Sequence, residues 1–177
     1  MVATTGTFVV FAYGSNMLTL RIRIRCPTAT SLGPAELHGH DLQWDKRSRD
    51  GSGKCNVVET KDATAVVYGV LYEIPDGERQ ALDQAEGLGN GYEARNREVV
   101  FNGAARIACV YCATKIDSSV KPYTWYKALV VAGAKEHKLP EKYIERLVAT
   151  GAMEDPDRER HARNWQLVAV DRPGRQL

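Results

Sequence analysis

The first patterned segment of the chain is a run of apolar or aromatic residues from Phe8 to Tyr13. Six such positions in a row are typical of a strand that is covered on both faces. Gly14, Ser15 and Asn16 favour turning and end this strand. We expect Ser15 or Asn16 to cap a helix from about Met17 to Arg25. The backbone amides at such a helix start point outward together and bind anions and carbonyl oxygens.

Apolar runs in the middle of the chain predict further strands. One strand is predicted over residues 36–44. Two more are predicted over residues 56–74, and we expect them to form a hairpin that turns at residues 61–62. A second hairpin is predicted over residues 97–113, because the dipeptide at residues 102–103 is Asn-Gly. Asn-Gly between two apolar runs is typical of a type I′ turn.

Three stretches have the 3.6-residue periodicity of helices, namely residues 75–85, 122–139 and 140–149. Beyond residue 150 the chain is charged and weakly patterned, which favours a solvated helix and tail. Strands and helices do not alternate strictly along the chain. We therefore expect an α+β fold with a mixed or barrel-like sheet rather than a doubly wound parallel sheet.

Length and charge restrict the domain count and the possible partners. The 177 residues, of which 44% are hydrophobic, suit one core. This predicts a single domain over residues 1–150 and a charged C-terminal extension over residues 151–177, packed on it or trailing from it. The 24 basic and 22 acidic residues leave a net charge of +2, which gives little attraction to nucleic acid or anionic lipid. We expect a small-molecule partner, no nucleic acid and no membrane.

The N-terminal segment carries no basic region, and its apolar run is too short for a signal peptide or a membrane span. A cytoplasmic protein is the expectation. Arg21, Arg23 and Arg25 could indicate a nucleic-acid-binding domain, but the small net charge disfavours it. We interpret these arginines as one solvated face of a helix, although their strict alternation with isoleucine would also suit a strand.

Two closely spaced pairs are candidates for a metal or redox site. Cys109 and Cys112 form a C-x-x-C motif, but odd spacing in a strand-like run sends the two side chains to opposite faces. We therefore interpret both cysteines as small apolar side chains that pack within the sheet. His38 and His40 would share one face of a strand, yet no third ligand lies at a useful spacing. We therefore expect no metal.

Glu86 is predicted at the last turn of its helix, where free carbonyl groups disfavour a negative charge. That position, with screening by Leu82 and Leu88, would raise the pKa of Glu86 and suit it to acid/base catalysis near neutral pH. The alternative is a glutamate that is merely solvated at a helix end, which local sequence alone favours. The glycine-rich residues 87–91 follow a helix instead of opening one, so we interpret them as a helix stop and flexible rim rather than a dinucleotide loop.

Several tyrosines complete the set of candidate residues: Tyr13, Tyr92, Tyr111 and Tyr126. A turn rich in free amides, a carboxyl group and hydroxyl donors, without an evident metal or nucleophile, match the needs of an intramolecular acyl transfer. Ser15 has no identifiable histidine partner and the chain has no G-x-S-x-G motif, which disfavours a serine hydrolase. The sequence itself does not place these residues in one pocket.

Four blocks of the chain resemble, in order, those of the γ-glutamylcyclotransferases. They are FAYGSNMLTLRIRIRCPTA (residues 11–29), VVYGVLYEI (66–74), LDQAEG (82–87) and YKALVVAGAKEHKLPEKYIERL (126–147). The resemblance implies a mixed domain built on a small β-barrel with flanking helices. It also implies conversion of a γ-glutamyl amino acid to 5-oxoproline and a free amino acid, without metal or cofactor. It favours a functional Glu86 over a merely solvated one.

The resemblance also implies roles for individual residues. Glu86 matches the proton acceptor. Substrate-binding positions are Phe11, Ala12, Tyr13, Gly14, Ser15, Asn16, Tyr92, Tyr111 and Tyr126. Met17 stands where the family pattern usually has leucine, which is a tolerable exchange. A homodimer is what relatives suggest.

Three interpretations of the function stay open at the level of sequence. The first is a cyclotransferase for γ-glutamyl amino acids in general, which Asn16 and the long C-terminal helical block favour. The second is a relative specific for γ-glutamylamines or for glutathione. The third is a non-catalytic metabolite-binding member of the same fold, against which the presence of Glu86 argues.

Overall fold

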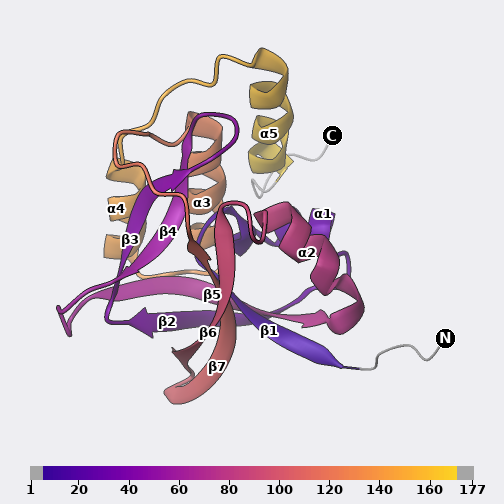
Figure 1. Ribbon diagram of the computed structural model, residues 1–177, viewed down its shortest axis with the longest axis vertical. Coiled ribbons are helices and arrows are strands. Elements are labelled where there is room, and N and C mark those ends of the chain that lie inside the picture. Colours follow the sequence, from indigo (N-terminus) through magenta and orange to yellow (C-terminus); the bar gives the residue numbers. More distant parts are fainter. Residues whose placement is uncertain (1–5, 171–177) are drawn as a thin grey trace.

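Five strands close into a barrel, which occupies the lower half of Figure 1. The computed structural model describes residues 6–170. The barrel strands are β1 (Thr7–Ala12), β2 (Thr30–His38), β5 (Val66–Pro75), β6 (Tyr92–Phe101) and β7 (Ala104–Ala113). Their order around the barrel is β1, β5, β2, β6 and β7, and the parallel pair of β7 and β1 closes it. The predicted α+β fold with a mixed barrel is confirmed.

Strand β1 confirms the strand expected at the N-terminal apolar run. Its C-terminal half, Val10 to Ala12, is buried, and it pairs with β5 along its whole length. Gly69 on β5 is required by the close approach of these two strands. A Cβ atom there would lie 2.5 Å from the Ala12 carbonyl oxygen and 2.6 Å from the Phe11 ring. The end of β1 is thereby held close against β5 within the barrel.

The hairpin of β6 and β7 is also as predicted. Phe101 pairs with Ala104, and both turn residues, Asn102 and Gly103, have positive φ angles of 51° and 77°. These are the backbone angles that a type I′ turn requires. The local Asn-Gly signal is sufficient here because both central positions need residues that tolerate the left-handed region.

A separate two-stranded sheet contains β3 (His40–Arg47) and β4 (Gly53–Glu59). Two sequence-based expectations are wrong at this point. The single strand over residues 36–44 is broken at Gly39, which has a φ of 68°. The hairpin at residues 61–62 does not form, because β4 pairs with β3 whereas β5 pairs with β1 and β2. The turn at Gly39 leads β3 out of the barrel, and β4 follows its antiparallel partner.

The helices lie on one side of the barrel and beside its mouth (Figure 1). The α-helices are α1 (Thr19–Arg25), α2 (Arg79–Glu86), α3 (Thr124–Glu136), α4 (Glu141–Ala149) and α5 (Arg158–Val170). Two short 3₁₀ turns, η1 (Ser15–Met17) and η2 (Asp76–Glu78), precede α1 and α2. No helix among residues 6–170 is long and apolar enough to cross a membrane.

The start of α1 differs from the prediction. The helix begins at Thr19, and neither Ser15 nor Asn16 caps it with a side-chain hydrogen bond. The side-chain amide of Asn16 instead donates to Glu86, 70 positions along the chain. A long-range partner has replaced the local cap. The amides that follow β1 are consequently part of a tight 3₁₀ turn rather than the first turn of an α-helix.

Helix α3 packs directly on this turn. Its Leu129 and Val130 are fully buried. A Cβ atom on Gly133 would lie 2.5 Å from the backbone nitrogen of Leu18 and 2.7 Å from the carbonyl carbon of Met17. Because backbone atoms cannot move aside, only glycine permits this approach. Helix α3 thus holds the turn after β1 in place through direct backbone contact.

The C-terminal segment is docked rather than solvated. Helix α5 packs against α3, and Trp165 and Val168 are partly buried against the core. The Asp155 side chain is fully buried and accepts hydrogen bonds from Trp125 Nε1 at 2.8 Å and from the Arg160 guanidinium. The charged pattern did not predict these contacts. The division into domain and extension at residue 150 stays a prediction, and the predicted tail over residues 171–177 lies outside the described residues.

Candidate active site

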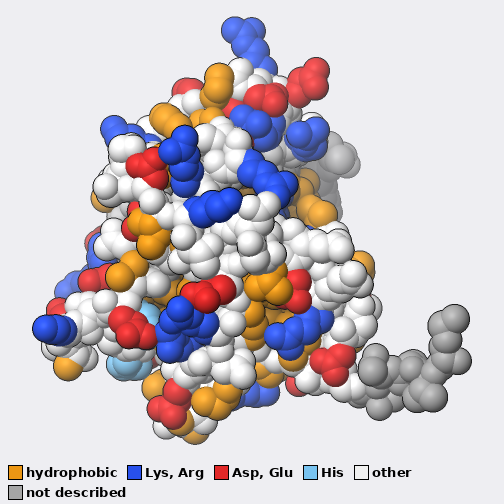
Figure 2. All heavy atoms as spheres, viewed as in Figure 1, with side chains coloured by type: hydrophobic (Ala, Val, Ile, Leu, Met, Phe, Trp, Pro, Cys, Tyr) orange, Lys and Arg blue, Asp and Glu red, His pale blue; other side chains and the backbone are white. Residues whose placement is uncertain are grey.

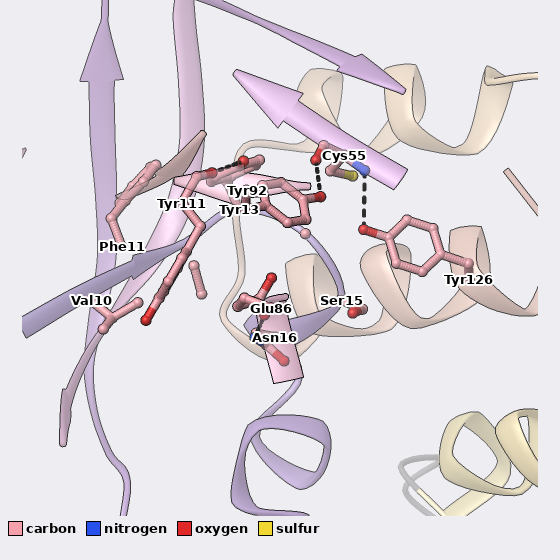
Figure 3. Close-up of a pocket in the computed structure, with 12 residues that line it drawn as sticks. Val10, Phe11, Tyr13, Ser15, Asn16, Cys55, Glu86, Tyr92, Tyr111 and Tyr126 are labelled. Carbon is pink, nitrogen blue, oxygen red and sulfur yellow. Dashed lines mark hydrogen bonds between the residues drawn. The ribbon is translucent and has the colours of Figure 1, made fainter. Parts of the chain in front are cut away.

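A cavity of about 40 Å³ lies where the end of β1, the turn after it and the end of α2 meet (Figure 3). Its lining includes Glu86 and every residue that the sequence predicted for substrate binding. Those residues are Phe11, Ala12, Tyr13, Gly14, Ser15, Asn16, Tyr92, Tyr111 and Tyr126. Val10 and Cys55 also line the cavity and were missed. The structure therefore brings the whole predicted set together.

Glu86 is held from two other elements. It is the last residue of α2, and Gly87 ends the helix in the left-handed conformation with a φ of 70°. Its Oε1 accepts hydrogen bonds from Asn16 Nδ2 at 2.5 Å and from Arg25 Nη1 at 3.1 Å. Arg25 Nη1 also donates to Asn16 Oδ1 at 2.5 Å. The carboxylate, with 16% of its side chain exposed, is thus oriented by one amide and one guanidinium.

The apolar screen expected around Glu86 is only half present. Leu82 is fully buried, but Leu88 is 43% exposed. The group that faces the carboxylate is the guanidinium of Arg25, which the sequence did not indicate as a partner. The expected solvated arginine face is accordingly wrong for Arg25. The three arginines do lie on a helix, yet only Arg23 among them is exposed.

The turn after β1 offers unpaired amide donors. Among residues 6–170, the amides of Gly14, Ser15 and Asn16 have no hydrogen-bond acceptor. Packing around Gly14 is tight: a Cβ atom there would lie 3.0 Å from the Tyr126 hydroxyl oxygen and 3.2 Å from Cys55 Cβ, so these side chains would have to move by a few tenths of an ångström. The turn can therefore present its amides beside Glu86, to which it is joined through Asn16.

A β-bulge explains how Cys55 becomes part of the site. Gln43 pairs with Asn56 and Lys46 with Lys54, so two residues of β3 oppose Cys55 alone. The bulge removes Cys55 from the ladder, and two tyrosines satisfy its backbone. Tyr92 donates to its carbonyl at 2.6 Å, and its amide donates to the Tyr126 hydroxyl at 3.1 Å. No local pattern in the sequence signals this role.

The Cys55 thiol is not activated. Burial raises the pKa of Cys55 to about 12, so the side chain stays a thiol at neutral pH. A nucleophilic role for this sulfur is disfavoured. Its contribution to the cavity is the position of its main chain, which orients Tyr92 and Tyr126.

The pocket tyrosines are protonated hydrogen-bonding groups. Burial raises the pKa of Tyr13, Tyr92 and Tyr126 well above the ordinary value. Tyr13 donates to the Tyr111 carbonyl, and Tyr111 donates to Asp83 Oδ1 at 2.6 Å. These hydroxyl hydrogens are therefore already engaged.

Tyr126 differs from the other three tyrosines. Its oxygen accepts the Cys55 amide, and its hydroxyl hydrogen has no oxygen or nitrogen acceptor among residues 6–170. The acceptor beside it is the Cys55 sulfur, which accepts only weakly, so Tyr126 is the pocket tyrosine whose hydroxyl a ligand could redirect most easily. In Figure 3 its ring enters the site from α3, across from Glu86.

Comparison with known proteins assigns the chain to a family. The γ-glutamylcyclotransferase of the mouse is 33% identical over 149 residues, which cover 81% of this chain and 78% of the mouse protein. The chain belongs to the γ-glutamylcyclotransferase family. The human γ-glutamylcyclotransferase is 32% identical over the same length and coverage. A model of the AIG2-like family matches residues 66–147.

A solved structure of a γ-glutamyl cyclotransferase has the same fold. It superposes on this chain with a TM-score of 0.81 at 27% identity, covering 91% of this chain and 99% of the solved one. The family assignment and the barrel agree with the resemblance seen in the sequence blocks. The chain is thus an enzyme of the cyclotransferase type.

The other candidate sites of this γ-glutamylcyclotransferase family member do not assemble. His38 ends β2 and His40 begins β3, so the two do not share a strand face as predicted. His40 Nδ1 lies 2.8 Å from the His38 carbonyl oxygen. Cys109 and Cys112 are free and buried. Within residues 6–170 no group of three or more His, Cys, Asp or Glu side chains could hold a metal ion.

Proposed function

We propose that this chain converts γ-glutamyl amino acids to 5-oxoproline and a free amino acid, with Glu86 as the general acid/base. The observation that carries the proposal is that Asn16 joins the turn after β1 to Glu86 within one cavity. That contact brings a proton acceptor and a set of amide donors to the same small volume. The names of the mouse and human relatives support the same reaction.

The substrate carries its own nucleophile. The α-amine of a γ-glutamyl compound reaches its own γ-carbonyl carbon and closes a five-membered ring, so the attack is already intramolecular. A bond forms between the α-nitrogen and the γ-carbon, and the bond from that carbon to the departing nitrogen breaks. The enzyme has to fold the substrate, move protons and stabilise the oxyanion. None of these steps requires a metal or a cofactor.

Glu86 would accept and donate the protons that the reaction moves. α-Amino groups titrate near about 8, so the substrate amine is largely an ammonium at neutral pH and must lose a proton before it attacks. Over the cycle two protons leave the α-nitrogen and two arrive on the departing nitrogen. A single carboxylate that accepts and returns protons balances this exchange. The hydrogen bonds that Asn16 and Arg25 donate to Glu86 hold the carboxylate in one orientation during these proton transfers.

The turn after β1 would stabilise the developing negative charge on the γ-carbonyl oxygen. The unpaired amides of Gly14, Ser15 and Asn16 are the available main-chain donors. One such donor is typically worth about 3 kcal/mol in the transition state. The hydroxyl hydrogen of Tyr126, which has only the weakly accepting Cys55 sulfur beside it, would add a side-chain donor for the substrate. Phe11, Ala12, Tyr13, Tyr92 and Tyr111 would form the walls that fold the glutamyl group.

An assay for 5-oxoproline release from γ-glutamyl-alanine tests this proposal. Wild-type protein should release the ring product and alanine in equal amounts. No ring product from γ-glutamyl-alanine, glutathione or γ-glutamyl-lysine, combined with tight binding of one of them, would instead indicate a non-catalytic binding protein. Turnover of glutathione alone, or of γ-glutamyl-lysine at its side-chain amide alone, would indicate the specialised branches.

We further propose a cytoplasmic location and a homodimer. The four cysteines are free and buried, which suits a reducing compartment. Fractionation of the native cell and light scattering of the purified chain test these two points separately.

A further inference from the structure

Two larger hollows adjoin the cavity and meet at Glu86. One has a volume of about 220 Å³ and the other about 380 Å³. Glu86, Lys46, Ser48 and Ala85 line both of them. A γ-glutamyl group that reaches Glu86 from the cavity would therefore direct its departing amino acid outward into these hollows.

Basic side chains dominate the walls of both hollows. Among the described residues, only two carboxylates line the hollows, those of Asp50 and Glu86. The cationic side chains that line them are Arg21, Arg25, Lys46, Arg47, Arg49, Lys54 and Lys115. Figure 2 shows Lys and Arg side chains gathered over the upper half of the face that carries the loop between β3 and β4. The net charge of the whole chain is only +2, so this basic lining is a local feature.

Some of these cations are neutralised by the protein. Arg25 pairs with Glu86 at 3.1 Å, Lys54 with Asp50 at 2.9 Å, and Arg47 with Asp117 at 3.1 Å. In contrast, Arg21, Lys46, Arg49 and Lys115 have no carboxylate within 4.0 Å among residues 6–170. Arg49 and Lys115 line only the larger hollow, so among these residues Arg21 and Lys46 are the unpaired cations of the smaller one. Both face the smaller hollow, which Glu86 also lines.

Lys46 is half-buried without an anionic partner. Burial lowers the pKa of Lys46 from its ordinary value, and the nearby Glu86 carboxylate opposes this effect. Its Nζ lies 4.8 Å from the centre of the Tyr92 ring, and Tyr92 lines the catalytic cavity. The ammonium group is thus positioned at the junction between the cavity and the outer hollows. An ammonium that has lost hydration is stabilised when a ligand brings an anion to it.

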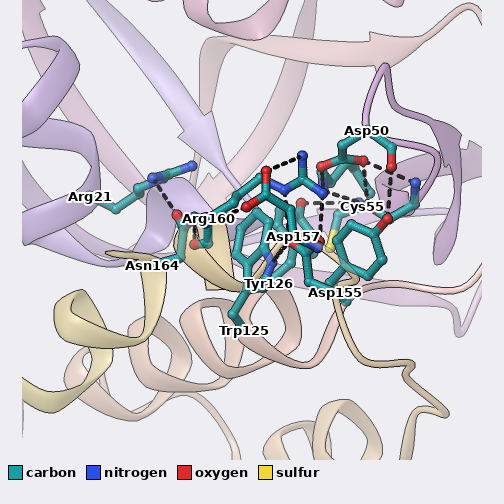
Figure 4. Close-up of polar contacts among 12 residues, drawn as sticks. Arg21, Asp50, Cys55, Trp125, Tyr126, Asp155, Asp157, Arg160 and Asn164 are labelled. Carbon is teal, nitrogen blue, oxygen red and sulfur yellow. Dashed lines mark hydrogen bonds and ion pairs between the residues drawn. The ribbon is translucent and has the colours of Figure 1, made fainter. Parts of the chain in front are cut away.

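Arg21 is the second such cation. Burial lowers the pKa of Arg21 to about 10, so it stays charged at neutral pH, and its Nε is buried without an acceptor in the described part of the chain. Nη1 donates to Asn164 Oδ1 at 3.2 Å, and Asn164 Nδ2 donates to the Arg160 carbonyl at 2.8 Å. Figure 4 shows this connection from α1 to α5. A neutral amide therefore orients the guanidinium and leaves its charge uncompensated.

We propose that Lys46 and Arg21 bind carboxylates of the departing amino acid, and that the preferred substrates are γ-glutamyl derivatives of acidic amino acids. This proposal rests on the proposed cyclotransferase function. A departing glutamate or aspartate carries two carboxylates, one for each uncompensated cation of the smaller hollow. A departing alanine carries one, and an amine without a carboxyl group carries none. Helix α5 contributes by positioning Arg21 through Asn164.

The test compares γ-glutamyl-glutamate with γ-glutamyl-glutamine, which has nearly the same shape and one charge fewer. Wild-type kcat/KM should be at least tenfold higher for the glutamate derivative, and 0.5 M salt should reduce this ratio by screening. γ-Glutamyl-alaninamide, whose departing amine has no carboxylate, should be the poorest of the three. Equal kcat/KM for the glutamate and glutamine derivatives would overturn the proposal.

Variants separate the two cations from the catalytic group. Lys46→Met and Arg21→Met should each reduce kcat/KM for γ-glutamyl-glutamate at least tenfold more than for γ-glutamyl-alaninamide. Asn164→Ala should give a smaller loss of the same kind. Lys142→Met, on the exposed face of α4, is the matched control and should change neither value. An equal loss with all substrates would show that these cations hold the glutamyl half, and would refute the proposal.

Binding measurements keep this test independent of turnover. Calorimetric titration of Glu86→Gln protein with the two dipeptides should show at least tenfold tighter binding of γ-glutamyl-glutamate. If no substrate yields 5-oxoproline but this preference holds, the proposed reaction fails and the acidic specificity stands. If 5-oxoproline is released from both dipeptides at equal efficiency and both bind equally, the reaction stands and the acidic specificity fails.

Discussion

The side-chain amide of Asn16 donates to Oε1 of Glu86 at 2.5 Å, although 70 positions separate the two residues. Asn16 belongs to the turn after the first barrel strand, and Glu86 ends helix α2. This single contact joins the amide donors of the turn to the carboxylate that we propose as the acid/base group.

Replacing the carboxylate should stop the reaction without unfolding the protein. Glu86→Gln keeps the shape of the side chain but removes the proton acceptor, so kcat for γ-glutamyl-alanine should fall at least about a thousandfold. The affinity for 5-oxoproline, measured by calorimetry, should stay within about threefold. Glu141→Gln on the exposed surface of α4 is the control. Retention of a tenth of the activity would show that another group moves the proton.

Removing the amide of Asn16 should affect kcat more than KM. Asn16→Ala leaves Glu86 with Arg25 as its remaining partner, so the carboxylate can rotate away from the attacking nitrogen. Misplacement of a catalytic group by about 1 Å costs on the order of 100-fold, and we expect a fall in kcat of about 10- to 100-fold. Steady-state kinetics of Asn16→Ala measure this effect. Asn96→Ala, at an exposed position on β6, is the control. A raised KM with normal kcat would assign Asn16 to substrate binding alone.

A side chain at Gly14 should disturb the turn. A Cβ atom would lie 3.0 Å from the Tyr126 hydroxyl and 3.2 Å from Cys55 Cβ, so Gly14→Val must displace one of them. We expect KM to rise by about tenfold or more, because the donors beside the substrate move. Gly151→Val, at a position with open space around its Cβ, should leave KM unchanged. An unaltered KM in Gly14→Val would count against the turn as the binding element.

Loss of the Tyr126 hydroxyl should reduce stability as well as activity. Tyr126→Phe leaves the buried amide of Cys55 without its acceptor, which costs about 1–3 kcal/mol of unfolding free energy. Urea unfolding followed by fluorescence measures this cost. Tyr143→Phe is the matched control, because the Tyr143 hydroxyl is buried without a partner in the described chain. The bulge would not depend on Tyr126 if both variants were equally stable.

The docking of helix α5 should weaken in acid. Hydrogen bonds from Arg160 lower the pKa of Asp155 from 3.8 to about 2. A carboxyl group with a depressed folded pKa stabilises the fold above its unfolded pKa and loses this contribution as pH falls toward the folded pKa. The contribution is about 2 kcal/mol above pH 5 and disappears between about pH 4 and pH 2.

Urea unfolding of Asp155→Asn tests this dependence. At pH 6 the variant should be less stable than the wild type by about 2 kcal/mol, and the difference should shrink toward zero at about pH 2. Glu145→Gln on the exposed face of α4 is the control and should follow the wild type at every pH. A difference that does not change with pH would show that the charge of Asp155 is not what holds α5.

Local patterns predicted the parts of this protein that depend on neighbouring residues. The apolar run before Tyr13 indicated β1, Asn102 and Gly103 indicated the β6–β7 turn, and Gly87 marked the end of α2. In each case the backbone angle or the burial pattern requires a particular residue type within a few positions. The family blocks then indicated which of these segments carry the chemistry.

The sequence by itself determined which segments turn, which are buried and which residues could react. Only the tertiary structure decided that β4 pairs with β3, that Arg25 lies on Glu86, and that a bulge presents Cys55 to two tyrosines. The physical reason is that periodicity records whether a side chain is buried but not what it is buried against. Contacts between residues about 60 or 70 positions apart, such as Arg25 with Glu86 and Asn16 with Glu86, arise only when separate elements pack.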